Sequence, residues 1–477
     1  MSKTLFIGGT WQSAASGAEF DTFDPATGVA HARCADAGRP EVDEAVAAAR
    51  AALDSPSWAG LTPPERAGIL WRIGDLIDEH AEELAQLETL DQGQPIGIAR
   101  MVSVGRTADH FRYYAGWVTK LYGETAPLSH PNVLQYTKRE PVGVCALITP
   151  WNFPMLIASW KIAPALACGN TVIVKPAEQT PMTTVRLVQL CQEAGIPDGV
   201  VNLLTGGPET GRALVEHPGV DKVSFTGSTE TGRAIVRASA GNLKRVSLEL
   251  GGKAPSIVLP DADLDAAVEG CVQGGLFNSG QVCAAYSRFL VHRSLADEFA
   301  ERCAKAVGQM RLGPGSAPGT DLGPLVSADH LAHVDALARS GVDEGATLLT
   351  GGSRADLPGY FFQPTVFTGV RDDMRIAREE IFGPVLTILT YDDEDEAIAR
   401  ANDTEYGLAA AVWTRDLAAA HRVAGAVHAG TVFINMPNPT DAAAPWGGFG
   451  ASGWGNEMGS GALGLYTEVK SVWTSLA

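Results

Sequence analysis

The alternation of apolar and polar positions divides the chain into a helical first part and two later stretches in which strands and helices alternate. Residues 5–12 predict a small hairpin around Gly8-Gly9. Apolar residues at three- and four-residue spacing then predict helices near 41–53, 63–90 and 97–118. From residue 142, short apolar runs alternate with helical patterns, and the expected strands are Val142–Ile148, Thr171–Val174, Val200–Leu204, Lys222–Phe225 and Arg245–Leu248. This alternation predicts βαβ units and a parallel sheet covered on both faces.

A second α/β stretch begins near Lys253. Its expected strands are Ser256–Leu259, Arg288–His292, Thr347–Leu349, Gln363–Val366, Val385–Tyr391, Leu408–Trp413 and Thr431–Ile434. The Gly-, Pro- and Asp-rich segment 313–324 predicts a loop. The final run, Tyr466–Trp473, has strand-forming residues but no apparent partner in the sequence. Such a strand often pairs with another subunit, which favours an oligomer.

Composition and charge exclude several classes of protein. The chain has 477 residues, which is too long for one compact core and predicts two or three domains. A net charge of −19 repels phosphate backbones and anionic lipid, so we expect neither nucleic acid nor a membrane as partner. The N-terminus lacks a signal-peptide pattern, and no apolar run approaches the ~20 residues that span a bilayer. Seven cysteines without C-x-x-C pairs or zinc-type spacing indicate reduced thiols, a cytoplasmic location and no metal site.

Three residues in separate segments offer the parts of covalent acyl chemistry. Cys283 lies in a loop rich in Gly, Asn, Ser and Gln, whereas the other six cysteines lie in apolar elements or, for Cys34, in an apparent surface segment. Glu249 ends a predicted strand, and Asn152 interrupts an apolar stretch. A thiol, a carboxylate and an amide can serve as nucleophile, general base and oxyanion donor. Taken singly, each also has an ordinary structural explanation, as a buried thiol, a paired acid or a turn-capping amide.

Two segments are candidates for a cofactor site. Phe225–Gly232 leaves a predicted strand and opens a helix, so its amides and the hydroxyl of Ser228 could receive a phosphate, although an ordinary N-cap has the same pattern. Lys175 and Glu178 follow the second strand of the sheet, where parallel sheets bind cofactors, although a surface ion pair is the common alternative. Gly459–Gly464 also matches G-x-G-x-x-G, but no strand precedes it and no helix follows. We interpret that segment as a flexible turn.

Together these segments resemble the NAD(P)-dependent aldehyde dehydrogenase superfamily, from the first hairpin to the last strand. The most specific matches are Thr149–Pro154, Lys175–Glu178, Phe225–Gly232, Glu249–Lys253, Gly280–Cys283, Glu379–Val385 and Pro445–Gly459. The resemblance implies an α/β fold with a Rossmann-like parallel-sheet cofactor domain, a second α/β catalytic domain and a small β oligomerisation extension. The expected boundaries are residues 1–122 and 142–251 for the NAD-binding domain, 252–450 for the catalytic domain, and 123–141 and 464–477 for the oligomerisation strands.

The resemblance also assigns roles to residues. It implies that Cys283 is the nucleophile, Glu249 the general base and Asn152 an oxyanion donor. The implied cofactor-binding residues are Trp151, Lys175, Glu178, Gly227, Ser228, Gly232, Leu250, Glu380 and Phe382. Glu178 beside the ribose would repel the extra phosphate of NADP, so we expect NAD to be preferred. The implied partner is an aldehyde, and the protein is expected to be a homodimer or homotetramer.

The substrate tunnel is expected to be roomy and apolar. Its predicted walls are Phe153, Trp160, Val282, Ala284 and Trp446, and the family's tunnel-shaping loop, here 435–444, is rich in alanine and poor in aromatic residues. These features predict medium-sized aliphatic or aromatic aldehydes. The chain departs from the family pattern at Gly450, where Lys is usual, and at Asn456, where Arg is usual. We expect the second departure to affect a subunit contact rather than the chemistry.

The leading hypothesis is therefore NAD-dependent oxidation of an aldehyde to a carboxylic acid through a cysteine thiohemiacetal and a thioester, with glutamate-assisted hydrolysis. One alternative is an esterase that uses Cys283 without redox chemistry. Another is a non-catalytic binding or structural protein on the same scaffold. The full set of cofactor motifs argues against the first alternative, and the presence of all three candidate catalytic residues argues against the second.

Overall fold

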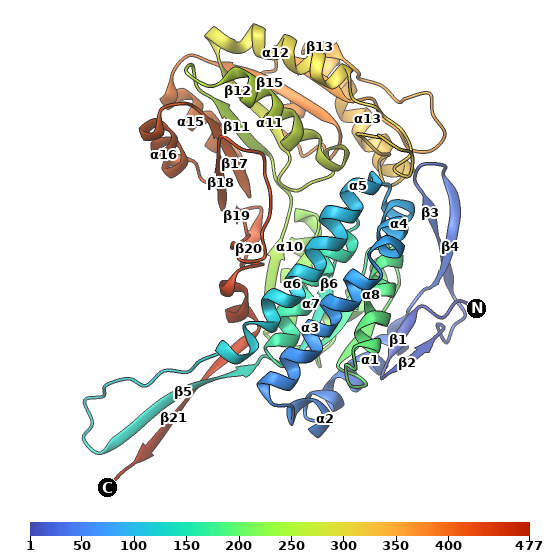
Figure 1. The fold of residues 1–477 in the computed structure, drawn as a ribbon, viewed down its shortest axis with the longest axis vertical. Helices are drawn as coiled ribbons and strands as arrows, with labels where there is room; N and C mark the ends of the chain where they lie inside the picture. The colour runs from blue at the N-terminus through green and yellow to red at the C-terminus, as the bar shows by residue number, and fades with distance from the viewer.

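The computed structural model describes all 477 residues and contains two large sheets, each covered by helices (Figure 1). The first sheet has the order β2-β1-β8-β7-β6-β9-β10-β20, and its five central strands from β8 to β10 are parallel. Its strands are β1 (Leu5–Ile7), β2 (Thr10–Gln12), β6 (Val144–Ile148), β7 (Thr171–Lys175), β8 (Val201–Leu203), β9 (Lys222–Thr226), β10 (Arg245–Glu249) and β20 (Gly453–Trp454). The predicted hairpin and the predicted parallel sheet are confirmed.

Two layers of helices bury both faces of this sheet. The helices are α1 (Arg39–Leu53), α3 (Pro63–Glu79), α4 (Ala81–Gln92), α6 (Gly105–Ala115), α7 (Pro154–Ala167), α8 (Met182–Glu193), α9 (Pro208–Glu216) and α10 (Thr229–Ser239). Cys145 and Leu147 of β6 belong to the core formed with α3, α6, α7 and α8. Val144 and Ala146 belong to the opposite core, formed with α1, α9 and α10. Burial on both faces explains why the strand is apolar at successive positions.

The second sheet has seven strands in the order β13-β14-β15-β12-β11-β17-β18 and is parallel except for β13. They are β11 (Ala254–Val258), β12 (Tyr286–His292), β13 (Thr347–Thr350), β14 (Thr365–Thr368), β15 (Val385–Tyr391), β17 (Ala409–Trp413) and β18 (Thr431–Ile434). Its main helices are α11 (Leu264–Leu276), α12 (Arg293–Gly308), α13 (Ala328–Asp343), α15 (Glu394–Asn402) and α16 (Leu417–Ala426). Separate cores lie on its two faces, with Phe289 and Val291 in one and Leu290 in the other.

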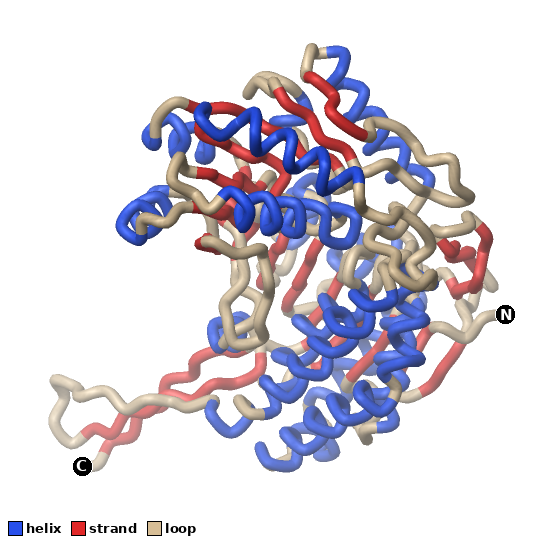
Figure 2. Tube along the Cα trace, turned by 45° about the horizontal axis from the view of Figure 1, so that its top comes forward, coloured by secondary structure: helices blue, strands red, loops and turns tan.

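A long two-stranded ribbon extends from the body of the molecule (Figures 1 and 2). It pairs β5 (Val133–Pro141) with β21 (Thr467–Ser475) in antiparallel register from Thr467↔Pro141 to Ser475↔Val133. The C-terminal strand therefore has a partner within its own chain, which corrects the expectation that it lacks one. The sequence concealed this partner because the two strands lie more than three hundred residues apart.

Several local predictions need correction. The helical pattern over 63–90 divides at His80 into α3 and α4, and the pattern over 97–118 includes a π-helical turn, η1 (Ala99–Val104), before α6. Gly459–Gly464 is not a flexible turn, because it enters the 3-10 helix η4 (Ser460–Leu465) with Ala462 and Leu463 buried. A hairpin of β3 (Glu19–Asp24) and β4 (Val29–Ala35) was not predicted, and it buries Cys34, which is no surface residue.

The remaining elements are short connections. They are α2 (Pro56–Ala59), α5 (Ile96–Ile98), η2 (Val118–Lys120), η3 (Phe277–Gly280), α14 (Arg375–Arg378), β16 (Tyr406–Gly407) and β19 (Phe449–Gly450). None of the helices is both long enough and apolar enough to cross a lipid bilayer.

Candidate active site

The site lies where the two halves of the first sheet diverge. Strands β6 and β9 are neighbours, but the chain leaves β6 for β7 on one side and leaves β9 for β10 on the other. Such a switch point opens a crevice at the carboxyl ends of the strands. Asn152 follows β6, Ser228 follows β9, and Glu249 is the last residue of β10. The parallel register then places Glu249 opposite Thr226.

The loop that carries Cys283 has an unusual backbone conformation. Asn278, Ser279 and Gly280 have φ values of 49°, 56° and 73°, so three successive residues are left-handed. A Cβ atom on Gly280 would lie 2.1 Å from the carbonyl oxygen of Gly383, which explains the glycine. Two buried side chains fix the loop: Ser279 Oγ donates to the Gly323 carbonyl at 2.8 Å, and Gln281 Nε2 donates to the Asn278 carbonyl at 3.1 Å. Strained backbone held this firmly is typical of functional sites.

Cys283 differs from every other cysteine in its exposure. It is partly accessible, whereas the other six thiols are buried, and all seven are free. Burial of the Sγ atom raises the pKa of the Cys283 thiol to about 12, and the charges of Glu249 and Glu380 act in the same direction. The backbone N–H groups of Cys283 and Ala284 act in the opposite direction. The thiol form therefore dominates at neutral pH, and a base is needed to generate the nucleophile.

The amide of Asn152 faces the loop that carries the thiol. Its Nδ2 donates to the carbonyl of Gln281 at 2.9 Å, and its side chain is buried. The backbone carbonyl of Asn152 accepts from Gln94 Nε2 at 3.0 Å and from Asn278 Nδ2 at 3.1 Å. Asn152 and Cys283 line one cavity. The structure thus brings together the amide and the sulfur that the sequence left 131 positions apart.

Glu249 is buried, and neither of its carboxylate oxygens has a hydrogen-bond partner. Burial raises the pKa of the Glu249 carboxyl well above its usual range, the negative charge of Glu457 raises it further, and Lys161 lowers it. Glu249 does not line the cavity with Cys283 and instead lies behind Gly447, whose Cβ atom would be 3.3 Å from Glu249 Oε1. The negative charge of Glu249 raises the pKa of the Cys283 thiol.

A buried ion pair that was not predicted from the sequence lies behind Glu249. Lys161 Nζ pairs with Glu457 Oε1, and Ser224 Oγ lies 3.3 Å from the same oxygen. All three side chains are buried. A lysine within the otherwise apolar helix α7 is the feature of the sequence that could have indicated this pair, because buried lysines are rare unless they are paired.

The residues expected to hold the adenosine ribose lie at the end of β7. Lys175 is buried, its Nζ donates to the Pro176 carbonyl at 3.0 Å, and it lies 3.7 Å from Glu178 Oε2. Burial lowers the pKa of Lys175, while Glu178 opposes this effect. Nearby, the buried hydroxyls of Thr149 and Thr226 lack hydrogen-bond partners and flank the switch point. Unpaired donors at this crevice fit a polar ligand such as a dinucleotide.

The turn after β9 combines an N-cap with two close packing contacts. Ser228 Oγ accepts from the backbone N–H of Thr231 at 3.2 Å, and so caps α10. A Cβ atom on Gly227 would lie 2.4 Å from the ring of Phe225, and one on Gly232 would lie 2.8 Å from the Leu250 side chain. The two glycines therefore let the strand, the helix and Leu250 approach closely, while the amides at the start of α10 remain available to a phosphate.

The segment expected near the nicotinamide is also rigid. Glu380 Oε1 accepts from the backbone N–H of Gly252 at 2.9 Å, and burial raises the pKa of this carboxyl to about 7. Phe382 has a left-handed φ of 54°, and its carbonyl lies 2.7 Å from His330 Nε2. Its ring meets the edge of Trp151 at a centroid distance of 5.2 Å. These contacts fix the ring beside the crevice.

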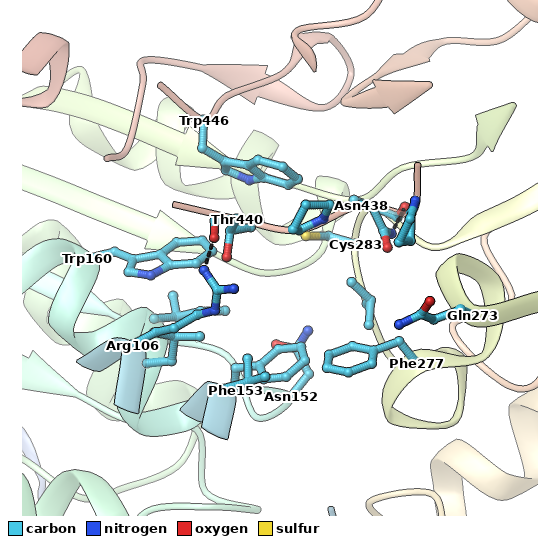
Figure 3. A pocket seen from close by; sticks show the side chains of 17 residues that line it. Arg106, Asn152, Phe153, Trp160, Gln273, Phe277, Cys283, Asn438, Thr440 and Trp446 are labelled. Atoms are coloured by element: carbon cyan, nitrogen blue, oxygen red, sulfur yellow. Dashed lines mark hydrogen bonds between the residues drawn. The ribbon is translucent and has the colours of Figure 1, made fainter. Parts of the chain in front are cut away.

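A cavity of about 220 Å³ leads to Cys283 (Figure 3). All five predicted wall residues line it: Phe153, Trp160, Val282, Ala284 and Trp446. Residues 437–440 of the predicted loop line it as well. Other wall residues were not predicted from the sequence, among them Val102, Arg106, Leu156, Ile157, Gln273 and Phe277. Helix α6 contributes Arg106 and helix α11 contributes Gln273, and both helices reach the cavity from elsewhere in the chain.

The two departures from the family pattern lie outside the cavity. Gly450 has φ +58°, and a Cβ atom there would be 2.7 Å from the carbonyl oxygen of Glu405. The backbone at this position therefore suits glycine better than lysine. Asn456 is exposed.

Comparisons with known proteins agree with this geometry. The profile described as the aldehyde dehydrogenase family matches residues 11–472. A betaine aldehyde dehydrogenase of Bacillus subtilis (strain 168) is 46% identical over 478 residues, covering 99% of this chain and 97% of that protein. A mitochondrial benzaldehyde dehydrogenase of Antirrhinum majus is 46% identical over 474 residues, covering 99% of this chain and 89% of that protein. The NAD+ complex of an aldehyde dehydrogenase from Bacillus cereus superposes with a TM-score of 0.98 at 49% identity, covering 99% of this chain and 96% of that one.

Proposed function

Because the chain belongs to the aldehyde dehydrogenase family, we propose that it oxidises an aldehyde to a carboxylic acid with NAD as acceptor. The observation that carries this proposal is the placement of Cys283. It is the one partly accessible cysteine, and it shares a cavity with the amide of Asn152.

Cys283 Sγ attacks the carbonyl carbon of the aldehyde after losing its proton to a base. The oxyanion that forms replaces the Gln281 carbonyl as the partner of Asn152 Nδ2, and the backbone N–H of Cys283 is the second donor. Removing one such donor typically costs about 3–4 kcal/mol of transition-state stabilisation. A bound NAD would supply the hydride acceptor, and Cys283 Sγ would hold the carbon that loses the hydride and becomes a thioester.

Glu249 acts in the second half of the reaction. Its carboxylate takes a proton from a water molecule, which hydrolyses the thioester and frees the thiol. Because its oxygens have no partners in the folded chain, they are free to accept that proton. A raised pKa also makes Glu249 a stronger base once it is ionised.

For the dinucleotide, we assign Lys175 and Glu178 to the adenosine ribose and Glu380 and Phe382 to the nicotinamide end. Ser228 and Trp151 would lie beside the pyrophosphate, and Gly227, Gly232 and Leu250 would shape the surface that receives it. The support is the crevice at the switch point with its unpaired threonine hydroxyls.

We further propose that NAD is preferred over NADP. Glu178 is partly exposed at the expected ribose, and Lys175 is already engaged by the Pro176 carbonyl. Two unit charges ~4 Å apart at an effective dielectric constant of 20 repel by about 4 kcal/mol, so the 2′-phosphate of NADP meets an unfavourable field. A higher kcat/KM with NADP than with NAD would refute this preference.

The preferred substrates are medium-sized aliphatic or aromatic aldehydes. The cavity has mostly apolar walls and about 220 Å³ of free volume, which suits a ring or a short chain. A betaine aldehyde dehydrogenase and a benzaldehyde dehydrogenase are among the similar proteins. A profile in which only very small aldehydes reacted would contradict this part of the proposal.

The ribbon of β5 and β21 is proposed to join subunits in a homodimer or homotetramer. It exposes the apolar side chains of Leu134, Tyr136, Val469 and Trp473, which a second subunit would cover. We retain the proposed division into residues 1–122 and 142–251, residues 252–450, and the ribbon. Seven free thiols support a cytoplasmic location.

The deciding experiment mixes the purified protein with NAD and a panel of aldehydes and follows reduced nicotinamide at 340 nm. We expect turnover by the wild type and its loss in Cys283→Ala. Cys34→Ala is the matched control, because that thiol is buried in β4 away from the site. An undiminished rate in Cys283→Ala would overturn the proposal. Ester hydrolysis without any NAD reduction would favour the esterase alternative.

A further inference from the structure

One side chain of the cavity does not fit its apolar walls. Arg106 is the only charged residue among the seventeen that line the space in front of Cys283. It projects from the first turns of α6, and Figure 3 shows its guanidinium between Trp160 and the loop that carries Thr440. The side chain is partly buried. A cation in such surroundings is costly unless it is paired.

Arg106 lacks the acidic partner that its neighbours have. Three arginines follow one another at six-residue spacing on this helical stretch. Arg100 pairs with Glu82 at 2.7 Å, and Arg112 pairs with Asp75 at 2.9 Å. The side chain of Arg106 makes one hydrogen bond, from Nη1 to the backbone carbonyl of Thr440, and forms no ion pair. Four of its five N–H donors therefore stay available.

The nearest acid along the loop does not fill this role. Asp441 follows Thr440, but it is exposed, and its Oδ1 accepts from the backbone N–H of Ala443 at 2.8 Å. The bond to the Thr440 carbonyl gives Arg106 an alternative role, as a tether for the loop. The two roles can be separated, because loss of a tether affects charged and neutral aldehydes alike, whereas loss of a substrate-binding cation affects the negatively charged aldehyde most.

We propose that Arg106 binds an anionic group, such as a carboxylate, at the end of the substrate remote from the aldehyde carbon. The aldehyde end meets Cys283 and Asn152, an apolar middle fills the cavity, and the carboxylate forms a bidentate pair with the guanidinium. This inference rests on the proposed oxidation of an aldehyde and specifies the substrate class. The product would then carry two carboxylates.

The test compares 4-carboxybenzaldehyde with its methyl ester, methyl 4-formylbenzoate, which differs by the charge and one methyl group. The readout is the ratio of kcat/KM for the acid to kcat/KM for the ester, measured with saturating NAD. We expect a ratio of at least about 10 in the wild type, because charge-assisted hydrogen bonds at a partly buried site are worth about this factor or more. Arg106→Gln should lower the ratio about 10- to 100-fold, mainly through KM for the acid.

Two further variants make the result specific. Arg106→Lys keeps the charge but loses the bidentate fork, so it should retain part of the ratio, whereas Arg106→Glu should reverse it. Arg100→Gln is the matched control, because it removes the same charge from the same helical stretch outside this cavity. Its ratio should equal that of the wild type.

The outcomes are distinct. A wild type with a higher kcat/KM for the ester than for the acid overturns the inference. An Arg106→Gln variant that loses the same factor of kcat/KM on both substrates also overturns it, because Arg106 then acts as a loop tether. If the protein reduces NAD with neither aldehyde nor with any other member of the panel, the proposed function itself fails. Turnover of neutral aldehydes with an unchanged ratio in Arg106→Gln would leave the proposed function intact and refute only the role of Arg106.

Discussion

Replacing Glu457 by glutamine should lower the pKa of Glu249 and let the enzyme work at lower pH. Burial and the charge of Glu457 both raise the pKa of the Glu249 carboxyl, whereas Lys161 lowers it. Glutamine removes the repelling charge, and its amide oxygen can still accept from Lys161 and Ser224. Because the Lys161 ammonium then stays buried without its carboxylate, this change should also cost about 3–5 kcal/mol of stability, and the assay is run at temperatures where the variant remains folded.

The size of the shift follows from Coulomb's law. As a general scale, two unit charges ~7 Å apart at an effective dielectric constant of 20 interact by about 2.4 kcal/mol, or about 1.7 pKa units. Relaxation of the site reduces this value, so we expect a shift of about one unit. Glu249 acts as a base only when it is ionised. The rate of thioester hydrolysis therefore falls as the pH drops through the pKa of Glu249, and this fall forms the acidic limb of the pH–rate profile. A lower pKa of Glu249 moves that limb to lower pH.

The assay is the pH dependence of thioester hydrolysis between pH 5 and 9. Stopped-flow detection of reduced nicotinamide separates a burst, which reports formation of the thioester, from the slower rate that follows. Lys161→Met should move the limb in the opposite direction, and the double variant should lie near the wild type. Lys161→Met should also cost about 3–5 kcal/mol of stability, because it leaves the Glu457 carboxylate buried without its partner.

Glu405→Gln is the matched control for this cycle. It makes the same carboxylate-to-amide change at an exposed ion pair with Arg233, where solvent and salt screen the charge. Its pH profile should match that of the wild type. An acidic limb of the Glu457→Gln profile at the same pH as in the wild type would refute this reasoning. Shifts of that limb in the same direction in Glu457→Gln and Lys161→Met would refute it as well.

Four further changes test other parts of the site and of the fold. Asn152→Ala should lower kcat/KM about 10²- to 10³-fold by removing an oxyanion donor, and a loss below fivefold in the same nicotinamide assay would contradict that role. Glu178→Gln should raise the ratio of kcat/KM for NADP to that for NAD, whereas an unchanged ratio would show that this charge does not select the cofactor. Gly280→Ala should abolish activity in the nicotinamide assay, because the new Cβ atom would lie 2.1 Å from the carbonyl oxygen of Gly383. Gly68 faces open space on α3, so Gly68→Ala should stabilise the fold by about 0.5–1 kcal/mol, measured by thermal denaturation.

Much of the fold could be predicted because its strands are apolar at successive positions. In β6, both faces are buried, so the run Val144–Ile148 stands out from any surface strand. The β3–β4 hairpin was missed because its residues alternate irregularly and few of them are buried. The division between α3 and α4 was also missed, since His80 interrupts the backbone without a glycine or proline to mark the break.

The candidate catalytic residues could be predicted because each occupies a distinctive local setting. Cys283 lies in a polar loop, and Glu249 stands between a strand and two glycines. Their partners could not be predicted in the same way. The ion pair of Lys161 with Glu457 joins residues 296 positions apart, and nothing near either residue indicates the other.

The sequence by itself determined the order of strands and helices, the family, and the residue types available for the chemistry, because periodicity and motifs are properties of neighbouring residues. Only the tertiary structure decided that β21 pairs with β5, that Cys34 is buried, and that Arg106 projects without an acidic partner into the cavity before Cys283. These features depend on which elements pack together after the chain closes on itself. The local spacing of apolar residues predicts that a helix buries one face, but it does not predict which charged groups or which cavity that face will contact.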